Sequence, residues 1–238
     1  MNKVYGGGEL VVKVLQEFGA KRVFGVPGGQ TLYVTDPLND TDIRFVHTRH
    51  ENGAACAADG WGRLTGEPGI CLATTGPGGD ASTVVWAMRE AYRVAKTGRP
   101  GPVVVDLYRD VVENQTASYE YVDPKNYCVM PESIANDEAI DAAFDVIKAN
   151  KKIALWIGNG VKLAHAQEEV KELSRLLDAP IVCTYNGICA IDTDFENLVG
   201  PRSRHGSAVT KATIEEADCV ILIGSTLTAI RTNRWEIK

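Results

Sequence analysis

Apolar residues follow two alternating patterns along the chain: short continuous runs, and spacings of three and four residues. The first such spacing predicts a helix that ends at Gly19. Its apolar face is made of Val11, Val14, Leu15 and Phe18. A second helix is predicted over residues 86–96. The continuous runs predict strands at residues 21–26, 43–48, 69–75 and 101–107.

These runs are apolar almost throughout, which is typical of parallel strands covered on both faces. A polar stretch with two prolines then interrupts the rhythm and predicts an interdomain connection. Beyond it, the pattern predicts a helix around 140–147 and strands at 151–158, 179–185 and 217–224. The fold is therefore expected to be α/β, with two open parallel-sheet, three-layer domains at residues 1–115 and 133–238. Residues 116–132 are expected to be the linker.

Composition narrows the class of protein. The net charge of −6 is spread without blocks of like charge, so no nucleic-acid surface is expected. No apolar run reaches membrane-spanning length, and no secretory signal is evident. The six cysteines form no C-x-x-C pair, which argues against a zinc or dithiol centre and favours buried, reduced thiols. We expect a cytoplasmic protein that binds neither nucleic acid nor a membrane.

Glycine-rich loops follow several of the predicted strands, where parallel sheets bind their ligands. Glycine there lets the backbone approach a ligand, but it serves equally well for a sharp turn. The loop at 158–160 does not complete a dinucleotide fingerprint, because Leu163 occupies the third glycine position. The glycines alone therefore do not identify a ligand.

Glu51 follows an apolar strand and opens a helix of small residues, in the stretch RHENGAACAADGWGRLTG. In one interpretation, Thr48 to Glu51 is a capping box, and Glu51 only satisfies a backbone N–H. In the other, the small residues allow close packing, which would keep the carboxyl away from water and raise its pKa for acid–base chemistry. His47 and His50 flank the same strand end, but too few further ligands accompany them for a metal site.

Several motifs occur together in an order typical of one family: VFGVPGG, RHENGAACAADGWGRLTG, ATTGPGG and GRPGPVVVDLYRDV, followed by IALWIGNGV, APIVCTYNG and EEADCVILIGSTL. Through them the chain resembles thiamine-diphosphate-dependent enzymes over essentially its whole length, above all the acetolactate (acetohydroxyacid) synthase large subunit. The resemblance implies a pyrimidine-binding domain at 1–115. It also implies a Rossmann-like central domain at 133–238 that is truncated at its C-terminus.

The resemblance implies that Glu51 is the catalytic residue. In the family this glutamate hydrogen-bonds the aminopyrimidine ring and favours the imino tautomer, which takes the proton from thiazolium C2. The carbanion attacks a 2-oxo acid such as pyruvate, and after decarboxylation the acyl unit passes to a second carbonyl, as in branched-chain amino-acid biosynthesis. The small helix would lie at the interface of a homodimer or tetramer. The implied cofactor-binding residues are Pro27, Gly28, Gly29, Thr75, Gly76, Pro77 and Gly78.

The central domain of the synthases binds FAD through glycine loops. The corresponding residues here are Gly158, Asn159, Gly160, Thr184, Tyr185, His205 and Gly224. Thr226 stands where the synthases carry an arginine, which argues against FAD.

Two further departures from the family are visible. Gly79 leads almost directly into the helix before GRPGPV, so we expect an internal deletion near residues 80–83. No G-D-G motif occurs, so we expect the magnesium and diphosphate site to lie outside this chain. Two alternatives to an enzyme stay open: a non-catalytic relative or fragment that associates with an intact subunit, and an unrelated Rossmann-like nucleotide binder.

Overall fold

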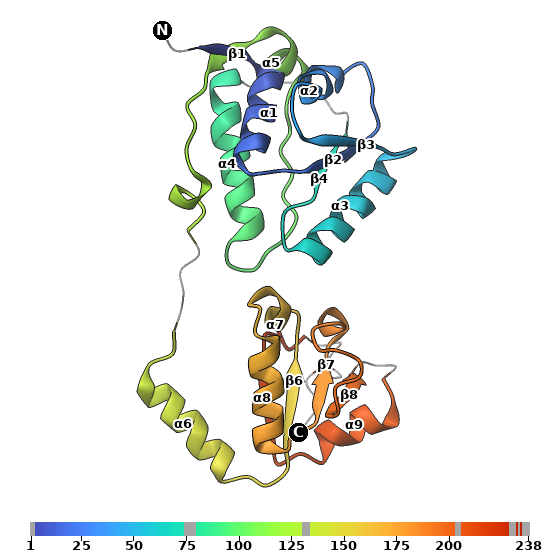
Figure 1. Ribbon diagram of the computed structural model, residues 1–238, viewed down its shortest axis with the longest axis vertical. Coiled ribbons are helices and arrows are strands. Elements are labelled where there is room, and N and C mark those ends of the chain that lie inside the picture. The colour runs from blue at the N-terminus through green and yellow to red at the C-terminus, as the bar shows by residue number, and fades with distance from the viewer. Residues whose placement is uncertain are drawn as a thin grey trace. The chain divides into compact units, whose positions relative to one another are not determined.

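The computed structural model describes residues 3–73, 80–129, 134–202, 206–228, 232 and 234. It divides into two compact units, Met1–Glu132 and Ser133–Lys238. Each unit holds a parallel sheet with helices on both faces, which confirms the predicted α/β fold class (Figure 1).

The sheet of the first unit has three parallel strands in the order β3-β2-β4. They are β2 (Arg22–Gly25), β3 (Arg44–His47) and β4 (Ile70–Leu72). Neighbouring side chains of β2 point to opposite faces, as strand geometry requires. Val23 belongs to the core beneath α1, and Phe24 packs against Ala54 and Ala58 on the other face.

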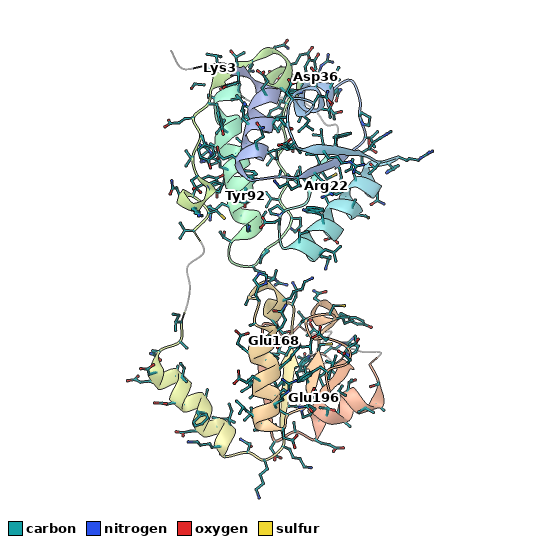
Figure 2. The ribbon with its side chains drawn as sticks, viewed as in Figure 1. Lys3, Arg22, Asp36, Tyr92, Glu168 and Glu196 are labelled. Carbon is teal, nitrogen blue, oxygen red and sulfur yellow. The ribbon has the colours of Figure 1, made fainter. Side chains whose placement is uncertain are left out.

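Four helices contribute to the larger core of this unit. They are α1 (Gly7–Glu17), α2 (Leu32–Leu38), α4 (Ala81–Lys96) and α5 (Arg109–Asn114). The start of α1 packs directly on backbone, since a Cβ on Gly7 would lie 2.0 Å from the Val111 carbonyl oxygen. Phe18, just after α1, stacks on Tyr92 of α4 with ring centroids 4.1 Å apart (Figure 2). The opposite face of the sheet is covered by α3 (Glu51–Thr65).

The predicted strand at residues 101–107 is not a strand in the structure. Its side chains differ in exposure: Val104 is 84% exposed, whereas Leu107 packs against the core. A strand needs a neighbour for its backbone hydrogen bonds, and among the described residues β4 pairs only with β2. The local sequence favours a strand, but no ladder forms.

The expected linker at 116–132 is in large part a packed segment of the first unit. Thr116–Ser118 forms β5, which pairs antiparallel with β1 (Val4–Gly6). A short 3-10 helix, η1, follows at Pro124–Asn126. The polar side chains that suggested a linker instead hydrogen-bond a buried carboxylate at the end of α1.

That carboxylate is Glu17, whose side chain is fully buried. Arg89 of α4 donates two hydrogen bonds to it, from Nε (2.7 Å) and Nη2 (2.8 Å). The hydroxyls of Tyr119 and Tyr127 donate to it over 2.7 and 3.0 Å. Burial raises the pKa of Glu17, but these hydrogen bonds outweigh it and the pKa is lowered overall. The segment after β5 is thereby fixed to α1 and α4.

The second unit has a four-stranded parallel sheet in the order β8-β7-β6-β9. Its strands are β6 (Ile153–Ile157), β7 (Ile181–Cys183), β8 (Leu198–Pro201) and β9 (Cys219–Ile223). Its helices are α6 (Asp137–Lys148), α7 (Gly160–Leu163), α8 (Gln167–Leu177) and α9 (Ala208–Glu215), with the 3-10 helix η2 at Tyr185–Gly187. One face packs against α7 and α8, and the other packs against Ile214 of α9.

The cysteines differ from expectation. All six are free thiols, but only Cys183 is buried, while Cys56, Cys71 and Cys189 are exposed. None of the described helices is long and apolar enough to cross a membrane.

Candidate functional site

The carboxyl ends of β2 and β3 bring the predicted catalytic residue and the loop at 27–29 to one edge of the sheet in the first unit. This is the edge where parallel sheets place their ligands. Four predicted cofactor-binding residues, Thr75, Gly76, Pro77 and Gly78, lie outside the described residues. The geometry of the site therefore comes from the loops after β2 and β3 and from the end of β4.

Glu51 is the first residue of α3, and His50 is the N-cap. His50 has extended backbone (φ −157°), and its Nδ1 accepts a hydrogen bond from the backbone N–H of Asn52 at 3.1 Å. Thr48 instead donates its hydroxyl to the carbonyls of Gly25 and His50. The expected capping box from Thr48 to Glu51 is therefore wrong, because His50 caps the helix and leaves the Glu51 carboxylate outside the cap.

The Glu51 side chain is 47% exposed. The expectation of a carboxyl held away from water is wrong for the single chain, because α3 packs through Ala54 and Ala58 and turns its first residues outward. The ring of His50 lies next to the carboxylate, with Nδ1 3.8 Å from Oε2, but this Nδ1 accepts the N–H of Asn52 and therefore carries no proton toward Glu51. The carboxylate is thus placed at the strand ends without a hydrogen bond from any residue that the structure describes.

Cys71 of β4 lies within the electrostatic reach of this carboxylate. Desolvation raises the pKa of the Cys71 thiol although the residue is exposed, and the negative charge of Glu51 raises it further. Local sequence patterns do not indicate this proximity, since the two residues lie on different elements. A thiol with a raised pKa is less nucleophilic at neutral pH, so Cys71 is not suited to act as a nucleophile here.

The loop at 27–29 is exposed and turns directly into α2. The Gly28 carbonyl accepts hydrogen bonds from the backbone N–H groups of Thr31 and Leu32, both at 3.0 Å. The Gly28 N–H donates to the Thr31 hydroxyl at 2.9 Å. A Cβ on Gly29 would meet nothing within 4 Å, so packing within the chain does not require glycine there. The open space above Gly29 is available to a ligand.

Most exposed residues of α3 are small or polar, although Leu64 near the end of the helix is apolar and 80% exposed. Asn52, Gly53, Ala55, Cys56 and Asp59 are all exposed. Packing within the chain explains the small residues only on the inward side of α3. There the backbone at Gly69 comes so close to the helix that a Cβ on Gly69 would lie 1.9 Å from the carbonyl oxygen of Ala58.

In the second unit, the candidate FAD glycines pack on one another. The N–H of Gly160 donates to the carbonyl of Gly224 at 2.8 Å, and a Cβ on Gly158 would lie 2.3 Å from the same oxygen. Gly224 has φ +59°, in the left-handed region that favours glycine. Close packing of the β6 and β9 loops thus accounts for these glycines without a ligand.

The remaining candidate FAD residues differ in their exposure to solvent. Thr184 is buried and its hydroxyl accepts a hydrogen bond from the N–H of Gly187, whereas Tyr185 is exposed. Asn159 is half-buried at the start of α7, and His205 lies outside the described residues. Among the described residues, no group of three or more His, Cys, Asp or Glu side chains is arranged to hold a metal ion.

Comparison with known proteins identifies both halves of the chain. Residues 6–105 match the family described as thiamine pyrophosphate enzyme, N-terminal TPP binding domain. Residues 140–238 match the central domain of thiamine pyrophosphate enzymes.

The similar curated proteins are acetolactate synthase large subunits. The one from Corynebacterium glutamicum is 30% identical over 277 residues, covering 92% of this chain and 44% of the relative. The probable large subunit from Methanocaldococcus jannaschii is 28% identical (92% of this chain, 46% of the relative), and the isozyme 2 large subunit from Escherichia coli is 29% identical (92% and 49%). The chain thus spans about half the length of the curated relatives it matches.

The alignment to the C. glutamicum protein contains more positions than the number of residues that this chain contributes to it. It has 277 positions, whereas 92% of 238 residues is about 219, so about 58 positions have no counterpart here. Gaps of this total size agree with the expected internal deletion, whose place near residues 80–83 stays a prediction. With both domain matches in order along the chain, the protein belongs to the thiamine pyrophosphate enzyme family and carries its N-terminal TPP-binding domain and its central domain.

Proposed function

We propose that this chain belongs to a thiamine-diphosphate-dependent 2-oxo-acid decarboxylase and carboligase of the acetolactate synthase type. In this proposal pyruvate or a similar 2-oxo acid is decarboxylated, and its acyl unit is transferred to a second carbonyl. Thiamine diphosphate, when bound, supplies the electron sink for both steps. Magnesium is proposed to bind with the diphosphate outside this chain. FAD is not part of the proposal, because the glycines expected to bind it are accounted for by packing.

The observation that carries the proposal is the placement of Glu51. The carboxylate stands at the ends of parallel strands, half-exposed, with its helix already capped by His50. It can therefore accept or donate a proton at the aminopyrimidine ring without first breaking a hydrogen bond to any residue that the structure describes. The open space above Gly29 and the exposed Gly28 suit the approach of a flat ring to the backbone.

The small outward side of α3 supports a second chain at this site. Burial of Glu51 between two chains would shield it from the solvent that now reaches it, the environment in which enzymes place carboxyl groups for general acid–base catalysis. We propose a homodimer or tetramer, or assembly with an intact homologous subunit.

Consumption of pyruvate in the presence of thiamine diphosphate and magnesium tests this function, measured on this chain joined to a diphosphate-binding domain, because the chain alone is not expected to turn over. Glu51→Gln removes the proton and is expected to lower the rate by about 10²–10⁴-fold, the usual contribution of general acid–base catalysis. Glu168→Gln changes an exposed carboxylate of the second unit and is expected to leave the rate unchanged. A rate in Glu51→Gln equal to that of the unchanged chain would refute the proposed role.

A non-catalytic role is the second candidate, favoured by the unpaired segment at 101–107 and the several dozen residues without counterpart. In that case the chain consumes no pyruvate but co-purifies with an acetolactate synthase large subunit. A folded chain that is inactive and strictly monomeric in the presence of such a subunit would exclude both candidates.

A further inference from the structure

Helix α6 of the second unit has an apolar stripe that stays exposed. Ile140, Ala143, Phe144 and Ile147 follow the i, i+3, i+4, i+7 spacing that places them on one side of the helix. None of the 12 residues of α6 is buried, and Ile140 and Phe144 are each 52% exposed. An isolated helix of this length is marginally stable in water, so α6 requires a surface to pack on.

The sheet of the same unit has an apolar strip that is also exposed. The edge strand β9 carries Val220 and Leu222, each 37% exposed. In the ladder they lie opposite Ala154 and Trp156 of β6, which pack against Ile214 of α9. Helix α9 therefore covers the part of this face over β6 and leaves the part over β9 open.

The opposite face of the sheet is already covered. Ile221 and Ile223 of β9 pack there with Leu155 and Ile157 of β6, in the core beneath α7 and α8. The strip over β9 is thus the part of this sheet that α6 can cover.

The connection between α6 and β6 suits this packing. It consists of residues 149–152, a length common for connections between a helix and a strand. Its end is fixed beside β9, because the Lys152 carbonyl accepts the N–H of Asp218 at 2.8 Å. Laid antiparallel to β6, the 12 residues of α6 span about 18 Å, close to the roughly 17 Å of the 5 residues of β6.

We propose that α6 closes onto the β9 strip of its own sheet, with the apolar stripe over Val220 and Leu222. The short connection holds α6 at an effective concentration far above that of a second copy, so the same chain supplies the helix. In the closed arrangement the N-cap, Asn136, lies at the edge of the sheet where the loops after β6 and β9 begin. Closure therefore brings the connection from the first unit to this edge. This inference does not depend on Glu51 or on turnover.

Amide hydrogen exchange of the full chain tests the closure directly. A synthetic peptide of residues 134–150 gives the exchange rates of α6 without a sheet. In the chain, the amides of residues 141–148 are expected to exchange slower by about 10-fold or more, because packing protects them. Rates equal to those of the peptide would overturn the proposal.

Two exposed residues of α6 give matched variants. Phe144 lies in the stripe, whereas Val146, 56% exposed, lies about 200° further around the helix. Phe144→Asp is expected to remove the protection of residues 141–148, and Val146→Asp is expected to keep it. Exchange in β6, measured in the same samples, shows that the sheet is folded. Equal effects of the two variants would contradict the stripe.

The sheet side is tested in the same way. Val220→Lys is expected to remove the protection of α6, whereas Leu176→Lys, on α8 and 75% exposed, leaves it unchanged. Protection that survives in Val220→Lys would contradict the strip over β9.

The concentration dependence of the protection identifies the chain that supplies the helix. Packing of α6 on its own sheet predicts the same protection after dilution by about 100-fold, because the effective concentration is set by the connection. Protection that is lost on dilution would assign α6 to a second copy and overturn the proposal.

Discussion

Two glutamates of the first unit, at opposite ends of their helices, show how one residue type is used in two ways. Glu17 ends α1 with its side chain fully buried, bound by Arg89 and two tyrosine hydroxyls. Glu51 begins α3 with its side chain 47% exposed and His50 3.8 Å away. The buried carboxylate of Glu17 is bound by other side chains and holds the fold together. The candidate catalytic carboxylate of Glu51 forms no hydrogen bond with the residues that the structure describes.

The comparison also corrects the expectation of a buried carboxyl at Glu51. A carboxylate whose hydrogen-bonding capacity is used inside the chain, as in Glu17, has a lowered pKa and is a poor proton donor. Glu51 forms no hydrogen bond with the residues that the structure describes, so among them its oxygens stay available to a ligand or a second chain.

Removal of the Glu17 carboxylate is expected to have the largest effect on stability. Glu17→Ala leaves Arg89 and two tyrosine hydroxyls without their shared acceptor. Loss of one partner of a buried pair costs about 3–5 kcal/mol of unfolding free energy. Urea titration followed by circular dichroism measures it. A loss below about 1 kcal/mol would show that the cluster is not needed for the fold.

Removal of the two tyrosine hydroxyls that bind Glu17 is expected to have an intermediate effect on the free energy of unfolding. Tyr119→Phe and Tyr127→Phe each remove one hydrogen bond to a charged group, worth about 1.5–3 kcal/mol. Because both hydroxyls bind the same carboxylate, the double variant is expected to deviate from additivity. Limited proteolysis between residues 119 and 129 provides a local readout, and unchanged cleavage in both variants would contradict the fixed segment.

The direction in which stability changes with pH tests whether the pKa of Glu17 is lowered in the folded chain. The folded-state pKa of Glu17 lies below its ordinary value of 4.5, so its contribution is complete above that pH and is lost as the pH falls through the lowered pKa. The difference in unfolding free energy between the unchanged chain and Glu17→Gln is therefore expected to shrink below pH 4.5. A difference that grows on acidification would contradict the assignment.

The smallest effect is expected on the outward side of α3. Asp59 and Arg63 form an exposed pair one helical turn apart, with both side chains at least 60% exposed. Asp59→Asn is expected to cost about 0.3–0.5 kcal/mol, as for other exposed helix pairs. Thermal unfolding measures the change. This applies to the monomeric chain, in which a loss above about 1 kcal/mol would contradict the exposure of the pair; in the assembly proposed above, where this helix side is buried, a larger loss is expected.

Local sequence was sufficient for most of the parallel strands, because apolar runs bounded by glycine predict them directly. The same pattern failed at 101–107, where the run contains Asp106 and forms no ladder with any strand among the described residues. Pairing is a property of distant segments, so the run alone could not show the difference.

The site was predicted less completely than the fold. The position of Glu51 at a strand end followed from the order of elements, but its exposure depends on which side of α3 packs on Phe24. Glu17 continues the buried positions of Leu10 and Val14 along α1, a signal that could have identified it as buried. Its tyrosine partners lie 102 and 110 residues away, beyond the reach of local patterns.

The account depends most on Glu51 being free to exchange a proton with the aminopyrimidine of thiamine diphosphate. The most direct measurement is the rate of C2 hydrogen–deuterium exchange of the cofactor, followed by NMR with magnesium and with this chain joined to a diphosphate-binding domain, for the unchanged sequence, Glu51→Gln and Glu168→Gln. The expected result is equal acceleration by the unchanged sequence and Glu168→Gln, with Glu51→Gln slower by about 10²-fold or more. Exchange in Glu51→Gln as fast as in the unchanged chain, or no acceleration by the unchanged chain, would contradict it.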